Sequence, residues 1–259
     1  MFEGKNLFDM SEKEWEQYRG SDCSIVFQDA LAALNPTLTV GRQIAEKIMI
    51  HTDMNKQQAY DEAERLLGLV GIPNPKKRLK QYPHEFSGGM RQRAMIAIAL
   101  ACQPKLLIAD EPTTALDVTI QADIIDLLKN LQKEFKMAVI LITHDLGIVA
   151  DIAKKIVVMY AGKVVETGSH YDIFYHAKHP YTQALLRAVP RLDVEEDQQL
   201  ESIEGTPPNM IAPPVGCAFS TRCKHCMKIC QKMQPPSFEF EDGHTAQCWL
   251  YYEQANSQQ

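Results

Sequence analysis

Long apolar runs are missing from this sequence of 259 residues. A membrane-spanning helix needs about 20 consecutive apolar residues, and Asp, Glu or Lys interrupts every candidate stretch here. The first residues, 1–6, also lack the basic segment and apolar core of a secretory signal. We therefore expect a cytosolic chain that reaches a membrane only through a partner.

An excess of positive charge is missing too. Lys and Arg number 27 against 33 Asp and Glu, which gives a net charge of −6. This balance argues against nonspecific nucleic-acid binding and against a polybasic membrane anchor. A hydrophobic content of 45% is ordinary for a globular protein, and the length allows one large domain with an appendage.

Apolar patterning predicts an α/β fold. Short β-branched or continuous apolar runs predict strands over 23–28, 105–110 and 138–143, and a hairpin over 156–167. Apolar residues at helical spacing predict helices over 40–50, 56–70 and 118–135. We expect the strand 138–143 to lie in an open parallel sheet that is covered on both faces. The block 37–82 is expected to form an inserted helical subdomain.

The sequence Ser87-Gly88-Gly89 opens an Ala/Ile-rich helix. Two glycines and a hydroxyl at a helix N-terminus offer unhindered N–H groups and a positive dipole end, which suit a phosphate. The plainer alternative is an ordinary N-cap. For these three residues taken alone, that alternative is the stronger one.

Polar side chains follow the predicted strands. Asp110 and Glu111 end one buried strand, where one carboxylate could hold Mg²⁺ and the other orient a water. His144 ends the next strand and Gln28 follows the first. Each also has a structural interpretation: solvated acids, a structural histidine, or an amide that satisfies the backbone.

Five motifs together resemble the ATP-binding subunits of ABC transporters. They match the Q-loop, signature motif, Walker B, D-loop and switch histidine of that family in the correct order: Gln28, 86–90, 107–111, 115–117 and 143–145. Further segments are similar to the oligopeptide/dipeptide/nickel importers, with the oligopeptide and dipeptide branch favoured: 27–36, 117–121, 179–182 and the terminal cysteines. The resemblance covers essentially the whole chain.

The resemblance implies roles for single residues. Gln28, Glu111 and His144 would be catalytic, and Asp110 with Gln28 would hold Mg²⁺. Residues that would bind nucleotide are Ser87, Gly88, Gly89 and Asp117. ATP and Mg²⁺ are the implied cofactors. In this family two ATPase subunits hold ATP between them, so the signature motif serves the nucleotide of the other subunit.

One family motif is absent. A P-loop needs Gly-x-x-x-x-Gly-Lys-Ser/Thr, and Gly-Lys occurs here only at 4–5 and 162–163, without the rest of the motif. We therefore expect an N-terminally truncated member with an incomplete ABC-type core, which alone binds ATP weakly. The expected parts are a core remnant with the Q-loop (1–36), a helical subdomain ending in the signature motif (37–92), the rest of the core (93–170) and a C-terminal cysteine module (171–259).

Five of the seven cysteines crowd into the last 43 residues, at 217, 223, 226, 230 and 248. In a reducing compartment such a cluster indicates a metal site before disulfides. The resemblance implies that Cys217, Cys223, Cys230 and Cys248 could hold a [4Fe–4S] cluster, with Cys226 spare. A Zn²⁺ site and a metal-free apolar knot remain open alternatives.

The resemblance also implies partners. These are a second ABC ATPase subunit, which favours a heterodimer, two transmembrane permease subunits and, indirectly, an extracytoplasmic peptide-binding protein. The chain would then lie peripherally on the cytoplasmic face of the cell membrane, with no nucleic acid bound. The alternatives are a catalytically impaired ATPase remnant and a non-transport ABC ATPase.

Overall fold

The computed structural model describes residues 1–114, 116–188 and 202–252. The chain divides into two compact units, Met1–His144 and Asp145–Gln259. Each unit is described by itself.

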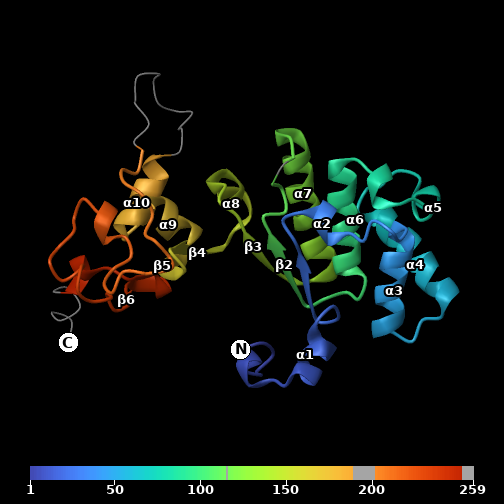
Figure 1. Ribbon diagram of the computed structural model, residues 1–259, viewed down its shortest axis with the longest axis horizontal. Coiled ribbons are helices and arrows are strands. Elements are labelled where there is room, and N and C mark those ends of the chain that lie inside the picture. The colour runs from blue at the N-terminus through green and yellow to red at the C-terminus, as the bar shows by residue number, and fades with distance from the viewer. Residues whose placement is uncertain (115, 189–201, 253–259) are drawn as a thin grey trace. The chain divides into compact units, whose positions relative to one another are not determined.

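A parallel sheet of three strands organises the first unit. Its order is β1 (Cys23–Val26), β2 (Leu106–Asp110) and β3 (Ala138–Ile142), and Figure 1 shows β2 and β3 side by side. Ile25 pairs with Ile108, and Ile108 with Ile140, so the carboxyl ends of the strands meet at one edge. The predicted parallel sheet is confirmed. β1 ends two residues and β3 one residue earlier than predicted, whereas β2 ends at residue 110, as predicted.

Helices lie against one face of this sheet. Ser24, Val26, Leu107 and Ala109 alternate with more exposed neighbours and are buried. The helix α6 (Gly88–Leu100) packs against β1. The predicted helix over 118–135 is α7 (Val118–Phe135), whose buried side chains recur at helical spacing: Ile124, Ile125, Leu128 and Leu131.

The other face of the sheet is open in the first unit. Ile140 and Ile142 are 50% and 47% exposed, and Ile25 and Phe27 are exposed as well. The prediction that the strand 138–143 is covered on both faces is therefore wrong. A continuous apolar run is typical of a strand covered on both faces, but the described part of the first unit supplies helices to one face only.

A block of helices lies between β1 and α6 in the sequence. It contains α2 (Ala30–Ala33), α3 (Val40–His51), α4 (Lys56–Leu69) and α5 (Pro75–Arg78). The helices α3 and α4 pack on each other, and both contact α6. The predicted helices over 40–50 and 56–70 are thus confirmed.

Short elements flank these parts. The N-terminal helix α1 (Glu12–Tyr18) begins with a capping box between Ser11 and Glu14. Short 3₁₀ turns occupy Leu7–Asp9 and Pro83–Glu85 in the first unit. In the second unit they occupy Ser220–Arg222, Glu241–Gly243 and Trp249–Tyr251.

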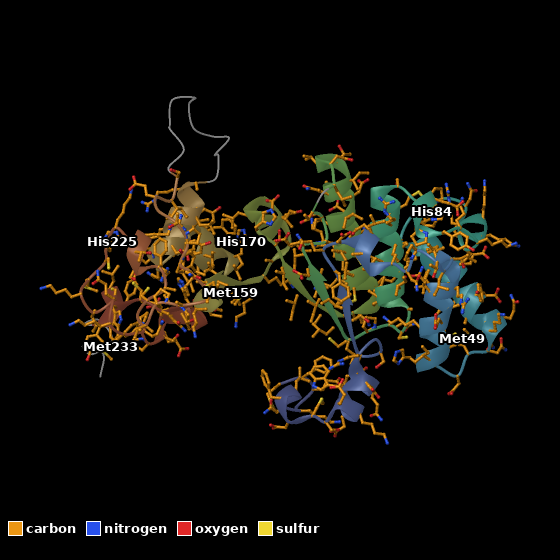
Figure 2. The ribbon with its side chains drawn as sticks, in the orientation of Figure 1. Met49, His84, Met159, His170, His225 and Met233 are labelled. Atoms are coloured by element: carbon orange, nitrogen blue, oxygen red, sulfur yellow. The ribbon has the colours of Figure 1, made fainter. Side chains whose placement is uncertain are left out.

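A four-stranded antiparallel sheet organises the second unit. Its order is β4 (Lys155–Tyr160), β5 (Lys163–Ser169), β7 (Thr245–Ala246) and β6 (Phe238–Glu239). The β4–β5 hairpin turns at Ala161 and Gly162, which both have positive φ, so the predicted hairpin is confirmed. One face of the hairpin carries a core that includes Val158 and Phe219. On the other face Met159 is exposed (Figure 2).

The described part of the second unit also contains the helices α8 (Leu146–Ile152), α9 (His170–His176) and α10 (Pro180–Arg187). His179 caps α10, because its Nδ1 accepts a hydrogen bond from the Tyr181 N–H at 3.1 Å. Across the described residues of both units, we find no helix with the length and apolarity that crossing a membrane requires.

Candidate functional site

Glu111 lies directly after β2 in a strained backbone conformation. Its φ is +43°, a region that non-glycine residues rarely adopt. Its N–H donates to the Ile142 carbonyl at 2.9 Å, and its carbonyl accepts from the Thr114 N–H at 3.1 Å. The second bond closes a turn with Pro112 at its second position. Non-glycine residues in such conformations cluster at functional sites.

Three side chains hold the Glu111 carboxylate. Gln28 Nε2 donates to Oε2 at 2.8 Å, and the Thr114 hydroxyl donates to the same oxygen at 2.8 Å. Nδ1 of His144 lies 3.0 Å from Oε1. The structure therefore brings together the three residues that the sequence proposed as catalytic, because β1, β2 and β3 end at one edge.

Thr114 belongs to this group and was missed in the sequence. The signal was present, since a threonine three residues after a carboxylate, across a turn with proline, returns its hydroxyl to that carboxylate. The hydrogen bonds from His144 and then from Thr114 lower the pKa of the Glu111 carboxyl. Glu111 is therefore ionised at neutral pH and can accept a hydrogen bond from a water.

Asp110 is the last residue of β2 and is half-buried. Gln28 uses its amide nitrogen on Glu111, which leaves its carbonyl oxygen for another partner. Carboxylate and amide oxygens are suitable ligands for Mg²⁺, which is usually held by one or two protein groups together with water and phosphate. Asp110 and Gln28 thus fit the role of partial Mg²⁺ ligands.

The Ser87-Gly88-Gly89 turn, here called the signature turn, opens α6. Ser87 is the N-cap, and its hydroxyl accepts from the Met90 N–H at 3.3 Å. Asp117 caps α7 in the same way, accepting from the Ile120 N–H at 2.9 Å. Ala115, the first residue of the predicted 115–117 motif, lies outside the described residues. The two predicted nucleotide-binding sets therefore sit at the N-termini of two helices, separate from the strand ends that carry Glu111.

Comparison with known proteins decides the family. The ABC transporter profile matches residues 2–114, and the profile of the oligopeptide/dipeptide transporter C-terminal region matches residues 165–230. A dipeptide transport ATP-binding protein of Bacillus subtilis is 53% identical over 98% of this chain and 76% of its own length. This chain belongs to the oligopeptide/dipeptide family of ABC transporter ATP-binding proteins.

Other relatives agree with this assignment. An oligopeptide transport ATP-binding protein of Escherichia coli is 51% identical over 96% of this chain and 73% of its own length. The dimeric ABC transporter cassette MJ0796 is 28% identical, with a TM-score of 0.56 over 62% of this chain and 68% of that structure. The chain is thus an ABC-type ATPase subunit. The comparisons do not show the expected N-terminal truncation, since the ABC transporter match begins at residue 2.

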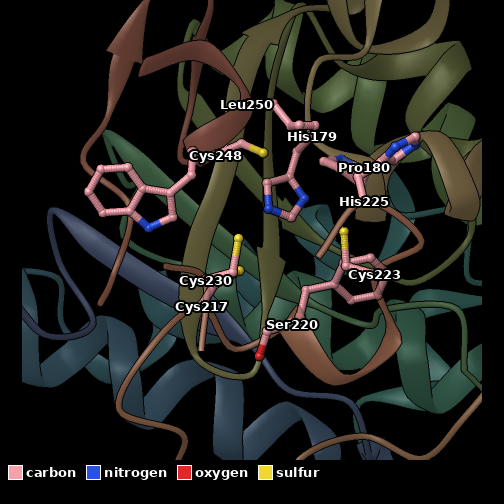
Figure 3. Close-up of a pocket in the computed structure, with 11 residues that line it drawn as sticks. His179, Pro180, Cys217, Ser220, Cys223, His225, Cys230, Cys248 and Leu250 are labelled. Carbon is pink, nitrogen blue, oxygen red and sulfur yellow. The ribbon is translucent and has the colours of Figure 1, made fainter. Parts of the chain in front are cut away.

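The cysteines of this ABC subunit line one small pocket of about 10 Å³. Its lining includes the four cysteines that the resemblance selected, whereas Cys226 is not part of it: Cys217, Cys223, Cys230 and Cys248. Figure 3 shows their sulfur atoms turned toward the space that the imidazole of His179 faces. The four cysteines that the family resemblance selected therefore line the same pocket.

The iron–sulfur and zinc interpretations find no support in this geometry. Among the described residues, no three His, Cys, Asp or Glu side chains are arranged to hold a metal ion. Burial raises the pKa of the Cys217 and Cys223 thiols, and that of Cys248 to about 11. These thiols are protonated at neutral pH while no metal is bound, and a metal would have to displace their protons. In the described structure the four pocket cysteines are free thiols, of which Cys230 and Cys248 are buried.

A buried polar network in the same unit was not foreseen from the sequence. The fully buried carboxylate of Glu166 accepts from the N–H groups of Lys178 and His179 at 2.6 and 3.0 Å. Nε2 of His244 lies 2.7 Å from its Oε1. Glu166 therefore fixes the start of α10 and ties β5 to β7.

Proposed function

We propose that this subunit energises the import of oligopeptides or dipeptides by ATP binding and hydrolysis. The observation that carries the ATPase part is the Glu111 carboxylate, held by Gln28, Thr114 and His144 where three parallel strands end. The cargo follows from the relatives, which are named for dipeptide and oligopeptide transport, and from the C-terminal match over residues 165–230.

The site residues divide between two nucleotides. We assign Glu111, His144 and Gln28 to hydrolysis at the nucleotide of this chain, with Asp110 and Gln28 on its Mg²⁺. The Glu111 carboxylate accepts a proton or a hydrogen bond from the attacking water, and His144 holds the Oε1 side of that carboxylate in place. Ser87, Gly88, Gly89 and Asp117 serve the nucleotide of a second ATPase subunit, because free N–H groups at a helix start suit its terminal phosphate.

The 259-residue sequence contains no Gly-x-x-x-x-Gly-Lys-Ser/Thr motif. Without that loop the phosphates at Glu111 lack their cradle of backbone N–H groups and their lysine. We infer that this chain alone binds ATP weakly and acts mainly by supplying the signature turn to its partner. A catalytically impaired subunit is thus the second candidate, favoured by this one sequence feature.

The proposed assembly contains a second ABC ATPase subunit, two permease subunits and an extracytoplasmic peptide-binding protein. The chain would lie peripherally on the cytoplasmic face of the membrane, held there by the permeases. Its parts are proposed to be a first core segment with the Q-loop (1–36), a helical subdomain (37–92), the remaining core (93–170) and the C-terminal module (171–259). The C-terminal module argues against a non-transport ABC ATPase, because it includes the match to the oligopeptide/dipeptide transporter C-terminal region.

For the pocket lined by the four cysteines we propose a [4Fe–4S] cluster, with Zn²⁺ as the alternative. Either would require the four thiols to lose their protons. Anaerobic purification followed by visible absorption and metal analysis separates the cases. A brown chromophore supports iron–sulfur, zinc alone supports the alternative, and a colourless metal-free chain supports an apolar knot.

Two experiments test the function. Uptake of labelled dipeptides and oligopeptides by cells with and without the gene tests the transport, and unchanged uptake of both would overturn it. Equilibrium titration of the purified chain with a fluorescent ATP analogue tests the nucleotide claim. We expect no saturation in the micromolar range, and micromolar affinity would contradict the inferred lack of a phosphate cradle.

A further inference from the structure

The residues of the signature turn contribute few interactions that hold its backbone in place. Two of its three residues are glycines, which have no side chain to pack and many accessible backbone conformations. Ser87 contributes one capping hydrogen bond at 3.3 Å. A turn that must present N–H groups to a phosphate therefore depends on neighbouring side chains for its placement.

The segment that begins α7 supplies those side chains. An ideal Cβ placed on Gly89 would lie 3.0 Å from Cγ2 of Ile120 and 3.9 Å from its Cδ1. A Cβ on Gly88 would lie 3.6 Å from Cδ2 of Leu116. A side chain at Gly89 would therefore meet Ile120 and one at Gly88 would meet Leu116, and the nearest atom to either position is the β-branch methyl of Ile120.

Ile120 is itself held firmly. It lies in the first turn of α7, where its N–H donates to the Asp117 carboxylate at 2.9 Å. A β-branched residue in a helix has essentially one χ1 rotamer, so the Cγ2 methyl has a fixed direction. Gln121 secures the preceding residues, because its Nε2 donates to the carbonyls of Thr113 and Leu116, both at 3.2 Å.

The helices α6 and α7 are also joined beyond this contact. Arg93 of α6 lies 3.7 Å from the carboxylate of Asp123 in α7. The same Arg93 donates to the Val70 carbonyl at 2.8 Å. A shift of α7 relative to α6 would therefore be transmitted to the glycines of the signature turn.

We propose that Ile120 is a positioning residue for ATP hydrolysis, because its Cγ2 methyl sets the placement of the Gly89 N–H group. This rests on the proposed function, in which the signature turn binds the nucleotide of a second subunit. Ile120 touches no nucleotide and acts through Gly89. The contact also links the signature turn to the segment that begins at Glu111. The residues that this chain offers to the two nucleotides are therefore positioned by the same segment.

Two substitutions separate positioning from simple core packing. Ile120→Val keeps both branches at Cβ, and so the methyl nearest to Gly89, but loses Cδ1. Ile120→Leu conserves the volume of the side chain and removes the β-branch. Packing alone predicts small losses of similar size for the two replacements, whereas the proposed role predicts a loss for Leu and little loss for Val.

The first measurement uses the full chain labelled with ¹⁵N-glycine, which has 13 glycine signals. Gly89→Ala assigns the Gly89 amide. We expect Ile120→Leu to shift or broaden that signal and Ile120→Val to leave it in place. Ile124→Leu, a buried β-branch one turn further along α7, is the control and should leave Gly89 unchanged. Equal effects of Leu and Val at position 120 would overturn the proposal.

The second measurement is ATP hydrolysis by the complex with the partner ATPase subunit. Ile120→Leu should lower kcat on the order of tenfold, since small misplacements of positioning groups have large kinetic effects. Ile120→Val should retain most of the rate, and a rate loss with Val but not Leu would overturn the proposal. If the wild-type complex hydrolyses no ATP, the proposed function fails, and the Gly89 amide signal still decides the role of Ile120.

Discussion

Nδ1 of His144 lies 3.0 Å from Oε1 of Glu111, although 33 residues separate them in the sequence. Neighbouring parallel strands cause this proximity, because β2 and β3 end at the same edge. The side chain of His144 is 77% exposed and that of Glu111 only 25%. The histidine therefore covers the carboxylate from the solvent side, and removing it should change the carboxylate without disturbing the core.

His144→Ala should raise the pKa of Glu111 toward its ordinary value, because the bond from His144 is the largest cause of its lowering. Thr114→Val should raise it less. Carboxyl ¹³C NMR of glutamate-labelled chain measures both, with Glu111→Gln for assignment and the exposed His84→Ala as control. A larger effect from Thr114→Val than from His144→Ala would contradict this ranking.

Acid should destabilise the second unit through His179. Burial lowers the pKa of His179 from 6.5 to about 4, against an opposing effect of the Glu166 charge. The unfolded chain then binds the extra proton first, so stability falls as pH drops from 6.5 toward about 4. The full effect is on the order of 3 kcal/mol.

Urea unfolding across this pH range tests the effect, followed by Trp249 fluorescence in a Trp15→Phe background. His179→Asn keeps a capping oxygen and cannot titrate, so its pH profile should be flatter than that of the wild type. The exposed His176→Asn should keep the wild-type slope. Equal slopes for wild type and His179→Asn would show that another group is responsible.

Glu166→Gln should destabilise the second unit by about 2 kcal/mol, because it replaces one acceptor oxygen of a buried network by a donor. That carboxylate accepts from two backbone N–H groups and lies 2.7 Å from Nε2 of His244. Glu239→Gln, exposed in the same unit, should stay near wild type. Thermal unfolding measures both, and equal melting temperatures would refute the importance of the network.

Gly41→Ala should destabilise the helical block by about 1–3 kcal/mol, because overpacking forces backbone shifts. A Cβ at Gly41 would lie 2.6 Å from the Leu79 carbonyl oxygen. Gly68→Ala is the matched control in the next helix, where the nearest atom is 3.6 Å away. It should be stabilising by about 0.5–1 kcal/mol, the usual gain of alanine over glycine in a helix. Circular dichroism during urea unfolding distinguishes the two.

The strands, the long helices and the grouping of Gln28, Glu111 and His144 were predictable, because periodicity fixes the elements and parallel strands bring their ends together. Coverage of the sheet was predicted wrongly, because the continuous apolar run around Ile140 is typical of a strand covered on both faces, whereas Ile140 is 50% exposed. Thr114 and Ile120 were overlooked as positioning groups because their roles depend on turn geometry and on the absence of a side chain at Gly89. The Glu166 network joins β5, β7 and α10, and no local pattern marks such a long-range contact.

The central claim is that the signature turn and Glu111 serve different nucleotides. ATP hydrolysis by the complex of this chain with its partner ATPase subunit tests it most directly, comparing Gly89→Asp with Glu111→Gln. We expect Gly89→Asp to lower the rate on the order of 100-fold, because the added carboxylate repels the phosphate that the Gly89 N–H faces. Glu111→Gln should change the rate little, because the nucleotide at Glu111 lacks its phosphate cradle and the complex hydrolyses mainly the nucleotide of the partner. A complex that tolerates Gly89→Asp but is inactivated by Glu111→Gln would contradict the account.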